Sequence, residues 1–74
     1  MTAVREILQV ENVMCQRCVA SIAAALGPID GLLGASANLM GEVTVAYDDA
    51  AVGIAVVAAL DEAGFPLRGR RPAP

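Results

Sequence analysis

The hydrophobic period changes in the middle of residues 4–26, which read VREILQVENVMCQRCVASIAAAL. In residues 4–11 most apolar side chains recur at every second position, on the side of Val4, Leu8 and Val10. This period of two is typical of a β-strand. From residue 16 to residue 26 the apolar positions recur at the spacing of one helix face. Residues 12–15, between them, follow neither period. The stretch therefore predicts a strand, a loop and a helix, in that order.

The chain then predicts a hairpin. Gly27 and Pro28 end the first helix, because glycine readily adopts the left-handed cap conformation and proline cannot continue a helix. Residues 31–39 and 42–47 are expected to form two strands joined by a short turn that contains glycine.

A second helix and a last strand complete the chain. Asp48 and Asp49 offer an N-cap with negative charge at the positive end of the helix, whose apolar spacing continues as far as Gly64. Residues 66–68 are expected to form a short strand, and residues 70–74 a flexible tail or the start of a linker.

The expected order of elements is therefore β-α-β-β-α-β. This order predicts an α+β fold, a ferredoxin-like sandwich in which a four-stranded antiparallel sheet carries both helices on one face. We expect residues 1–69 to form this domain. A chain of 74 residues has room for one modest core, which excludes a two-domain enzyme with a cleft between its domains.

The composition excludes several classes of function. The chain has two cysteines and no histidine, so a metal site cannot use imidazole ligands. One tyrosine and one phenylalanine are too few to stack the bases of a single strand. The net charge of −3 does not attract a phosphate backbone. Nucleic acid is therefore not an expected partner.

The high apolar content does not predict direct membrane insertion. Hydrophobic residues make up 57% of the chain and the mean hydropathy is +0.61. The longest apolar run, residues 50–60, has eleven residues, whereas a membrane-spanning helix needs ~20. Residues 1–6 lack the basic region and long apolar segment of a signal peptide. We therefore expect a cytoplasmic protein.

Both cysteines lie in one motif, Cys15-Gln16-Arg17-Cys18, where the first strand leads into the first helix. The spacing places Cys15 in the loop and Cys18 in the first helical turn, so that both sulfur atoms can face one point. Backbone N–H groups and the positive end of the helix favour the thiolate form, and Arg17 adds positive charge. The motif predicts a pair of soft, partly ionised ligands at the surface.

Two thiolates without further ligands restrict the choice of metal. Cu(I) is soft and tolerates two ligands. Zn(II) takes four ligands in structural sites, or three and a water in catalytic ones, and this chain has no third cysteine or histidine to supply them. Hg(II) also accepts two thiolates, so ligand type leaves it open.

Other uses of the motif stay open at this point. The cysteines can form a simple disulfide, act as small buried side chains, or belong to an interaction module that holds no metal. A thioredoxin-like enzyme also has a Cys-x-x-Cys at the start of a helix. That fold usually has a longer chain, an aromatic residue before the first cysteine and Gly-Pro between the two, whereas this chain has Met14 and Gln16-Arg17.

Several short motifs, in this order, resemble the heavy-metal-associated domain, the module of copper chaperones, mercury carriers and the N-terminal parts of metal-transporting P-type ATPases. The resemblance covers residues 5–68. The motifs that carry it are Cys-x-x-Cys at 15–18, Ile-x-x-Ala-Leu at 22–26, Gly-Leu at 31–32, Ala-Asn-Leu at 37–39, Val-Thr-Val-Ala-Tyr-Asp at 43–48 and Ala-Leu-Asp-Glu-Ala-Gly-Phe at 59–65.

The chain departs from the family pattern just before the first cysteine. The family usually has Gly-Met-Thr/Ser-Cys there, and this chain has Asn12-Val13-Met14-Cys15. Val13 stands where the family's methionine packs under the loop, and Met14 where a small hydroxyl residue is common. Family members that handle zinc often have aspartate directly before the first cysteine, so Met14 favours Cu(I) over zinc.

The resemblance implies a Cu(I) carrier and not an enzyme. Its implied ligands are Cys15 and Cys18, and the residues expected around them are Met14, Arg17 and Phe65. Phe65 either shields the ion or only closes the core, and both interpretations stay open. A mercury carrier of the same fold and a thiol–disulfide redox protein are the alternatives.

The implied partner is another Cys-x-x-Cys protein or domain, of a copper ATPase or a chaperone, which takes the ion by thiolate exchange. Residues 1–67 contain two arginines and eight carboxylates, a net charge of −6. This charge predicts a basic docking patch on the partner. The chain itself is expected to be a monomer, with a metal-bridged dimer as the other state.

Overall fold

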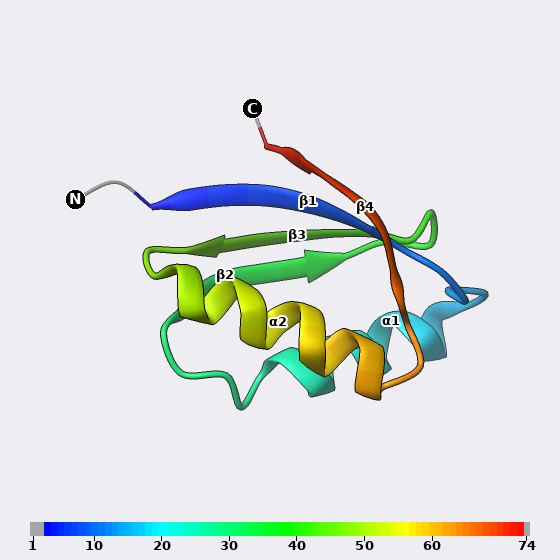
Figure 1. Cartoon of the computed structure of the whole chain (residues 1–74). Helices are drawn as coiled ribbons and strands as arrows, with labels where there is room; N and C mark the ends of the chain where they lie inside the picture. The colour runs from blue at the N-terminus through cyan, green and yellow to red at the C-terminus, as the bar shows by residue number, and fades with distance from the viewer. Residues whose placement is uncertain (1–2, 74) are drawn as a thin grey trace.

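A computed structural model describes residues 3–73 and confirms the predicted ferredoxin-like fold. The sheet has the strand order β2-β3-β1-β4, and each neighbouring pair is antiparallel. Both helices lie on one face of this sheet (Figure 1). The elements in chain order are β1 (Val4–Val10), α1 (Gln16–Leu26), β2 (Leu32–Ala37), β3 (Glu42–Tyr47), α2 (Ala50–Glu62) and β4 (Leu67–Pro72).

The core lies between the sheet and the two helices. Strand β3 shows the alternation most clearly, because Val43, Val45 and Tyr47 are buried and the residues between them are half-buried. Burying one such aliphatic side chain stabilises a fold by ~1.5–3 kcal/mol. The other buried residues of this core are Leu8, Val10, Ile22, Leu26, Val52, Val56, Leu60 and Phe65.

Helix α2 is held by caps at both ends. The carboxylate of Asp49 accepts a hydrogen bond of 2.9 Å from the backbone N–H of Ala51, which confirms the predicted N-cap. At the other end Gly64 adopts a φ of +95°, a conformation that glycine reaches without strain. The backbone N–H of Phe65 then donates to the carbonyl of Leu60 at 2.8 Å.

The predicted flexible tail at residues 70–74 is wrong for residues 70–72. These residues continue β4, which pairs with β1 through Leu8↔Arg70 and Ile7↔Arg71. Two side-chain ion pairs hold them, Arg70 with Glu6 at 2.7 Å and Arg71 with Glu42 at 2.6 Å. Pro72 tolerates this place because β4 is an edge strand. Pro74, the last residue of the predicted tail, lies outside the described residues.

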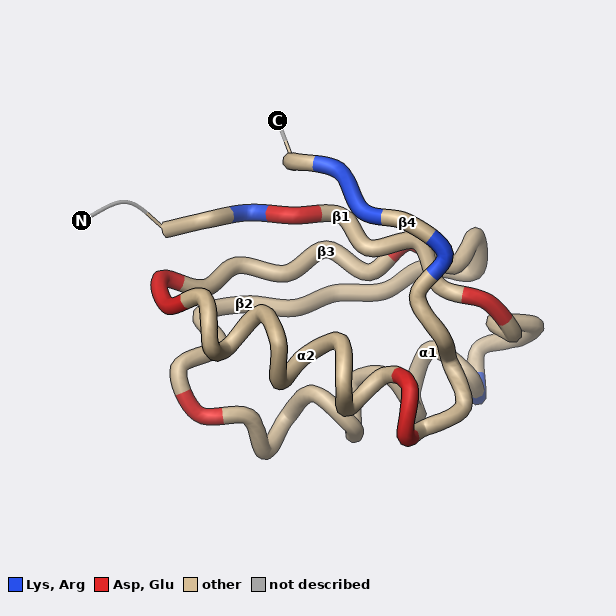
Figure 2. The backbone as a smooth tube through the Cα atoms, in the orientation of Figure 1, with Lys and Arg blue, Asp and Glu red and all other residues tan. Residues whose placement is uncertain are grey.

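The strand also changes the predicted charge of the folded body. Arg68, Arg70 and Arg71 all belong to β4, so their charge lies against the sheet beside carboxylates and not on a separate tail (Figure 2). The folded unit therefore carries the −3 of the whole chain, and the body of net −6 with a basic tail is wrong.

Glu6 lies on the inner face of β1 with its side chain largely covered, and two partners hold its charge. The hydroxyl of Tyr47 and the guanidinium of Arg70 both donate hydrogen bonds to its carboxylate. The bond from Arg70 is the main reason that the pKa of Glu6 lies below its ordinary value. The same carboxylate raises the pKa of Tyr47.

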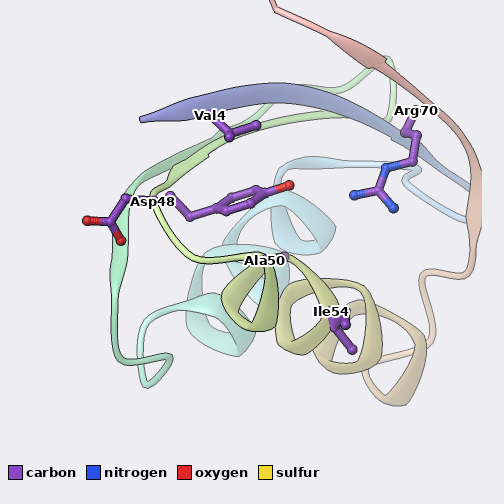
Figure 3. Close-up of a pocket in the computed structure, with 7 residues that line it drawn as sticks. Val4, Asp48, Ala50, Ile54 and Arg70 are labelled. Atoms are coloured by element: carbon purple, nitrogen blue, oxygen red, sulfur yellow. The ribbon is translucent and has the colours of Figure 1, made fainter. Parts of the chain in front are cut away.

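A hollow of about 320 Å³ opens beside this cluster, between β1, β4 and the first turns of α2. Figure 3 shows Arg70 pointing into the hollow from β4, with Ile54 on the facing helix. Helix α2 forms one wall of the hollow. It packs closely on Tyr47 at Gly53, where a Cβ atom would lie 2.8 Å from the tyrosine ring, so a larger residue would force the two apart.

No helix among residues 3–73 is long and apolar enough to cross a membrane.

The first prediction concerns the core. Leu60 belongs to α2 and is fully buried, so Leu60→Ala should lower the free energy of unfolding by about 2–5 kcal/mol through lost burial and a cavity. Chemical denaturation measures this loss. Ile54→Ala, in the same helix but 73% exposed, is the control and should change the value by less than about 0.5 kcal/mol. Equal losses in the two variants would contradict the packing described.

The second prediction concerns β4. Arg70→Gln should lower the free energy of unfolding at pH 7 by about 0.2–1 kcal/mol, the range for a solvent-exposed pair. Since the folded pKa of Glu6 is depressed, its contribution is present above the unfolded pKa of ~4.3 and is lost as pH falls through the folded pKa. The difference between wild type and variant should therefore shrink in acid.

Arg68→Gln is the matched control for this prediction. Arg68 is exposed on the same strand and forms no ion pair with any residue in the range 3–73. Denaturant titrations between pH 2 and pH 7 should leave this variant parallel to wild type. If Arg70→Gln has no effect at any pH, the ion pair between Arg70 and Glu6 does not stabilise this edge of the sheet.

Candidate metal centre

The two cysteines lie where the structure turns from β1 into α1. Cys15 is the N-cap residue of α1 and has an extended backbone, and its side chain makes no capping hydrogen bond. Its carbonyl accepts from the backbone N–H of Cys18 at 3.0 Å, which starts the first helical turn. The predicted placement of Cys15 in the loop and Cys18 in the first turn is confirmed. We call residues 11–15 the cysteine loop.

The two thiols are free, and they differ in exposure. Cys15 is exposed, whereas Cys18 is half-buried and packs against the hydrophobic core. The side chain of Cys15 is one of the neighbours that lower the pKa of Cys18. Among residues 3–73, no group of three or more His, Cys, Asp or Glu side chains is placed to hold a metal ion. The site thus combines one thiol fixed against the core with one that is open to solvent.

The environment of Cys18 favours its thiolate. A hydrogen bond from the backbone of Met14 is the largest cause that lowers the pKa of Cys18, followed by one from the backbone of Cys15. Burial acts in the opposite direction, and the charge of Arg17 makes the smallest contribution. The predicted stabilisation of a thiolate at the start of the helix therefore comes mainly from backbone N–H groups.

The other residues expected near the site differ in how far they are exposed to solvent. Met14 is 85% exposed and Arg17 is also exposed. Phe65 is only 6% exposed and belongs to the core cluster, which favours the interpretation that it closes the core. Val13 is half-buried and packs against this core, as the family's methionine was expected to do at that position.

Asn12 is a residue of the site that the sequence analysis did not single out. It has a φ of +73°, in the left-handed region where asparagine is one of the few residues found besides glycine. Its side-chain amide donates a hydrogen bond of 3.0 Å to the carbonyl of Gly64. The next contact along the loop, from the backbone N–H of Glu11 to the carbonyl of Pro66, measures 3.1 Å. The departure from the family's glycine was the available signal.

Comparison with known proteins places this geometry in a family. The sequence model of the heavy-metal-associated domain matches residues 7–66. The chain is 38% identical over 65 residues to "Copper chaperone CopZ" of Staphylococcus aureus, and the match covers 85% of this chain and 96% of that protein.

Solved structures have the same fold. A structure named "CopZ metallochaperone" superposes with a TM-score of 0.77 at 37% identity and covers 85% of this chain and 97% of its own. The yeast copper transporter domain Ccc2a has a TM-score of 0.82 at 22% identity, covering 95% of this chain and 99% of its own. Oxidised MerP from Ralstonia metallidurans has a TM-score of 0.79 at 19% identity, covering 92% and 100%. The last two show the fold alone.

The third prediction concerns the reactivity of Cys18. In a Cys15→Ser variant, which leaves one thiol, the rate of alkylation by iodoacetamide should rise with pH around a midpoint below ~8.5, the ordinary value for cysteine. The reason is that backbone hydrogen bonds from the loop favour the thiolate. The same variant unfolded in urea is its own control and should return to the ordinary midpoint. Identical midpoints in the two states would contradict the described environment.

Proposed function

Because the chain belongs to the heavy-metal-associated domain family, we propose that it binds Cu(I) through the thiolates of Cys15 and Cys18 and passes the ion to a partner. The observation that carries the proposal is the pair of free, neighbouring thiols at the start of α1, one anchored on the core and one exposed. Relatives named copper chaperones support metal binding and transfer as the general role.

The choice of Cu(I) rests on the ligands. Two thiolates are soft donors, and Cu(I) accepts them without a third ligand. Zn(II) would need further ligands, but the chain has two cysteines and no histidine, and no carboxylate among residues 3–73 is placed to complete a set of three with the thiols. Hg(II) shares the preference for two thiolates and is the alternative cargo for the same site.

The unequal exposure of the thiols gives an order to the transfer. A thiolate of the partner approaches from the side of exposed Cys15 and forms a third bond to the ion. The bond from the ion to Cys15 then breaks, and a second partner thiolate replaces Cys18, which the core holds in place. No electron is transferred, and each new Cu–S bond replaces an old one.

The proposed partner is another protein or domain with its own Cys-x-x-Cys, either a copper ATPase or a chaperone. The charges next to the site are mixed. Glu11 begins the cysteine loop, and Asp61 and Glu62 lie at the end of α2, which the hydrogen bond from Asn12 to Gly64 joins to that loop. Arg17 stands between the two cysteines. A partner with a modest excess of basic residues complements this face better than a strongly basic one. In this proposal the chain is a carrier and not an enzyme, and it acts as a monomer in the cytoplasm.

A thiol–disulfide redox role is the second candidate. The lowered pKa of Cys18 and its contact with Cys15 favour it, because a stabilised thiolate next to a second thiol is the chemistry of disulfide exchange.

The fourth prediction tests the carrier. The reduced protein without oxygen should bind one Cu(I) per chain, and Cys15→Ser with Cys18→Ser should abolish this binding, because both ligands are lost. Competition with a Cu(I) chelator, read by mass spectrometry of the intact protein, measures both. Met14→Leu is the matched control: its exposed thioether is replaced by an isosteric hydrocarbon, and the affinity should stay the same.

Three outcomes would change the proposal. Stoichiometric binding by the double variant would exclude the two thiolates as ligands. Preference for Hg(II) over Cu(I) in the same competition would make the protein a mercury carrier. Reduction of insulin disulfides without Cu(I) binding would support the redox role instead.

A further inference from the structure

The segment that carries Cys15 in the candidate metal centre has few buried side chains to hold it in place. Between the end of β1 and Cys15, Val13 is half-buried but Met14 and Cys15 are exposed. Cys18, by contrast, is fixed by the first turn of α1 and by the core. The position of Cys15 therefore depends on what holds residues 12–14.

Asn12 provides two features at this point. Its φ of +73° turns the chain out of β1 into the cysteine loop. Its side-chain amide reaches across 52 positions of sequence and donates to the carbonyl of Gly64 at 3.0 Å. A glycine at position 12, as in the family pattern, would allow the same backbone turn but could not make this hydrogen bond.

The acceptor of this hydrogen bond is itself anchored. The N–H of Gly64 donates to the carbonyl of Asp61 at 3.1 Å, and the N–H of Phe65 donates to the carbonyl of Leu60 at 2.8 Å. Leu60 and Phe65 are both core residues. The carbonyl of Gly64 is thus held by the capped end of a packed helix and not by a free loop.

From this geometry we infer that Asn12 is a positioning residue of the metal centre: its amide clasps the cysteine loop to the end of α2 and holds Cys15 ready for the ion. The inference rests on the proposed Cu(I) carriage. A clasped loop loses less freedom when the ion binds, so the clasp raises affinity without touching the metal.

Two variants of Asn12 isolate the clasp. Asn12→Gly keeps the left-handed turn but adds flexibility, and Asn12→Asp keeps the size and the turn but adds a charge. Their shared change is the loss of the amide donor. Both should weaken Cu(I) affinity roughly 3- to 10-fold, the effect of one hydrogen bond, when measured by chelator competition on the folded chain. Measuring in 1 M salt screens the charge of the aspartate.

Gln9→Glu is the matched control. Gln9 also donates a side-chain hydrogen bond to a distant carbonyl, that of Met40 at 2.8 Å, but it lies on β1 and not in the cysteine loop. This variant should lower the free energy of unfolding about as much as Asn12→Asp and leave Cu(I) affinity unchanged. A merely structural Asn12 would behave in the same way as Gln9.

Amide hydrogen exchange of the metal-free chain provides a second readout. Residues 13–18 should exchange faster in both Asn12 variants and at the wild-type rate in Gln9→Glu. Unchanged affinity in both Asn12 variants would overturn the inference. If wild type binds no Cu(I), the proposed function fails, and exchange decides the clasp separately: faster exchange supports it, and unchanged exchange overturns it.

Discussion

The packing of α2 on the sheet is the interaction on which the rest of the structure depends. Val56 and Leu60 have no exposed surface, and they fix both the position and the end point of the helix. The end of the helix then places Phe65 in the core and directs the carbonyl of Gly64 at the cysteine loop. A hydrophobic contact in the core thus determines where a polar contact of the metal centre can form.

The charged cluster around Glu6 and the candidate metal centre lie toward opposite ends of β1. Glu6, with its ties to Tyr47 and Arg70, lies near the start of the strand. The cysteine loop follows its end, and the four residue steps from Glu6 to Val10 span roughly 13 Å at about 3.3 Å per residue. At that distance salt screens the effect of one charge cluster on the other.

Local signals in the sequence were enough for most of the fold. The change of period after Val10 and the cap at Asp49 each act within a few residues, because strands and helices repeat over short distances and caps bind adjacent N–H groups. The extent of β4 was not predictable in this way. Its stretch of Arg70, Arg71 and Pro72 has the composition of a tail. It forms a strand because its backbone pairs with β1, which is distant in sequence, and ion pairs with Glu6 and Glu42 support that pairing.

The same division applies to the metal centre. The sequence by itself indicated the two candidate thiol ligands, their placement at the start of a helix and the soft class of metal that such thiolates suit, because a Cys-x-x-Cys motif is local and thiolate chemistry belongs to the residues. Only the tertiary structure decided the rest. It placed Phe65 in the core, left Met14 in solvent, and brought the amide of Asn12 to the carbonyl of Gly64. These placements depend on how a helix far along the chain packs and ends, and no local pattern encodes that distance.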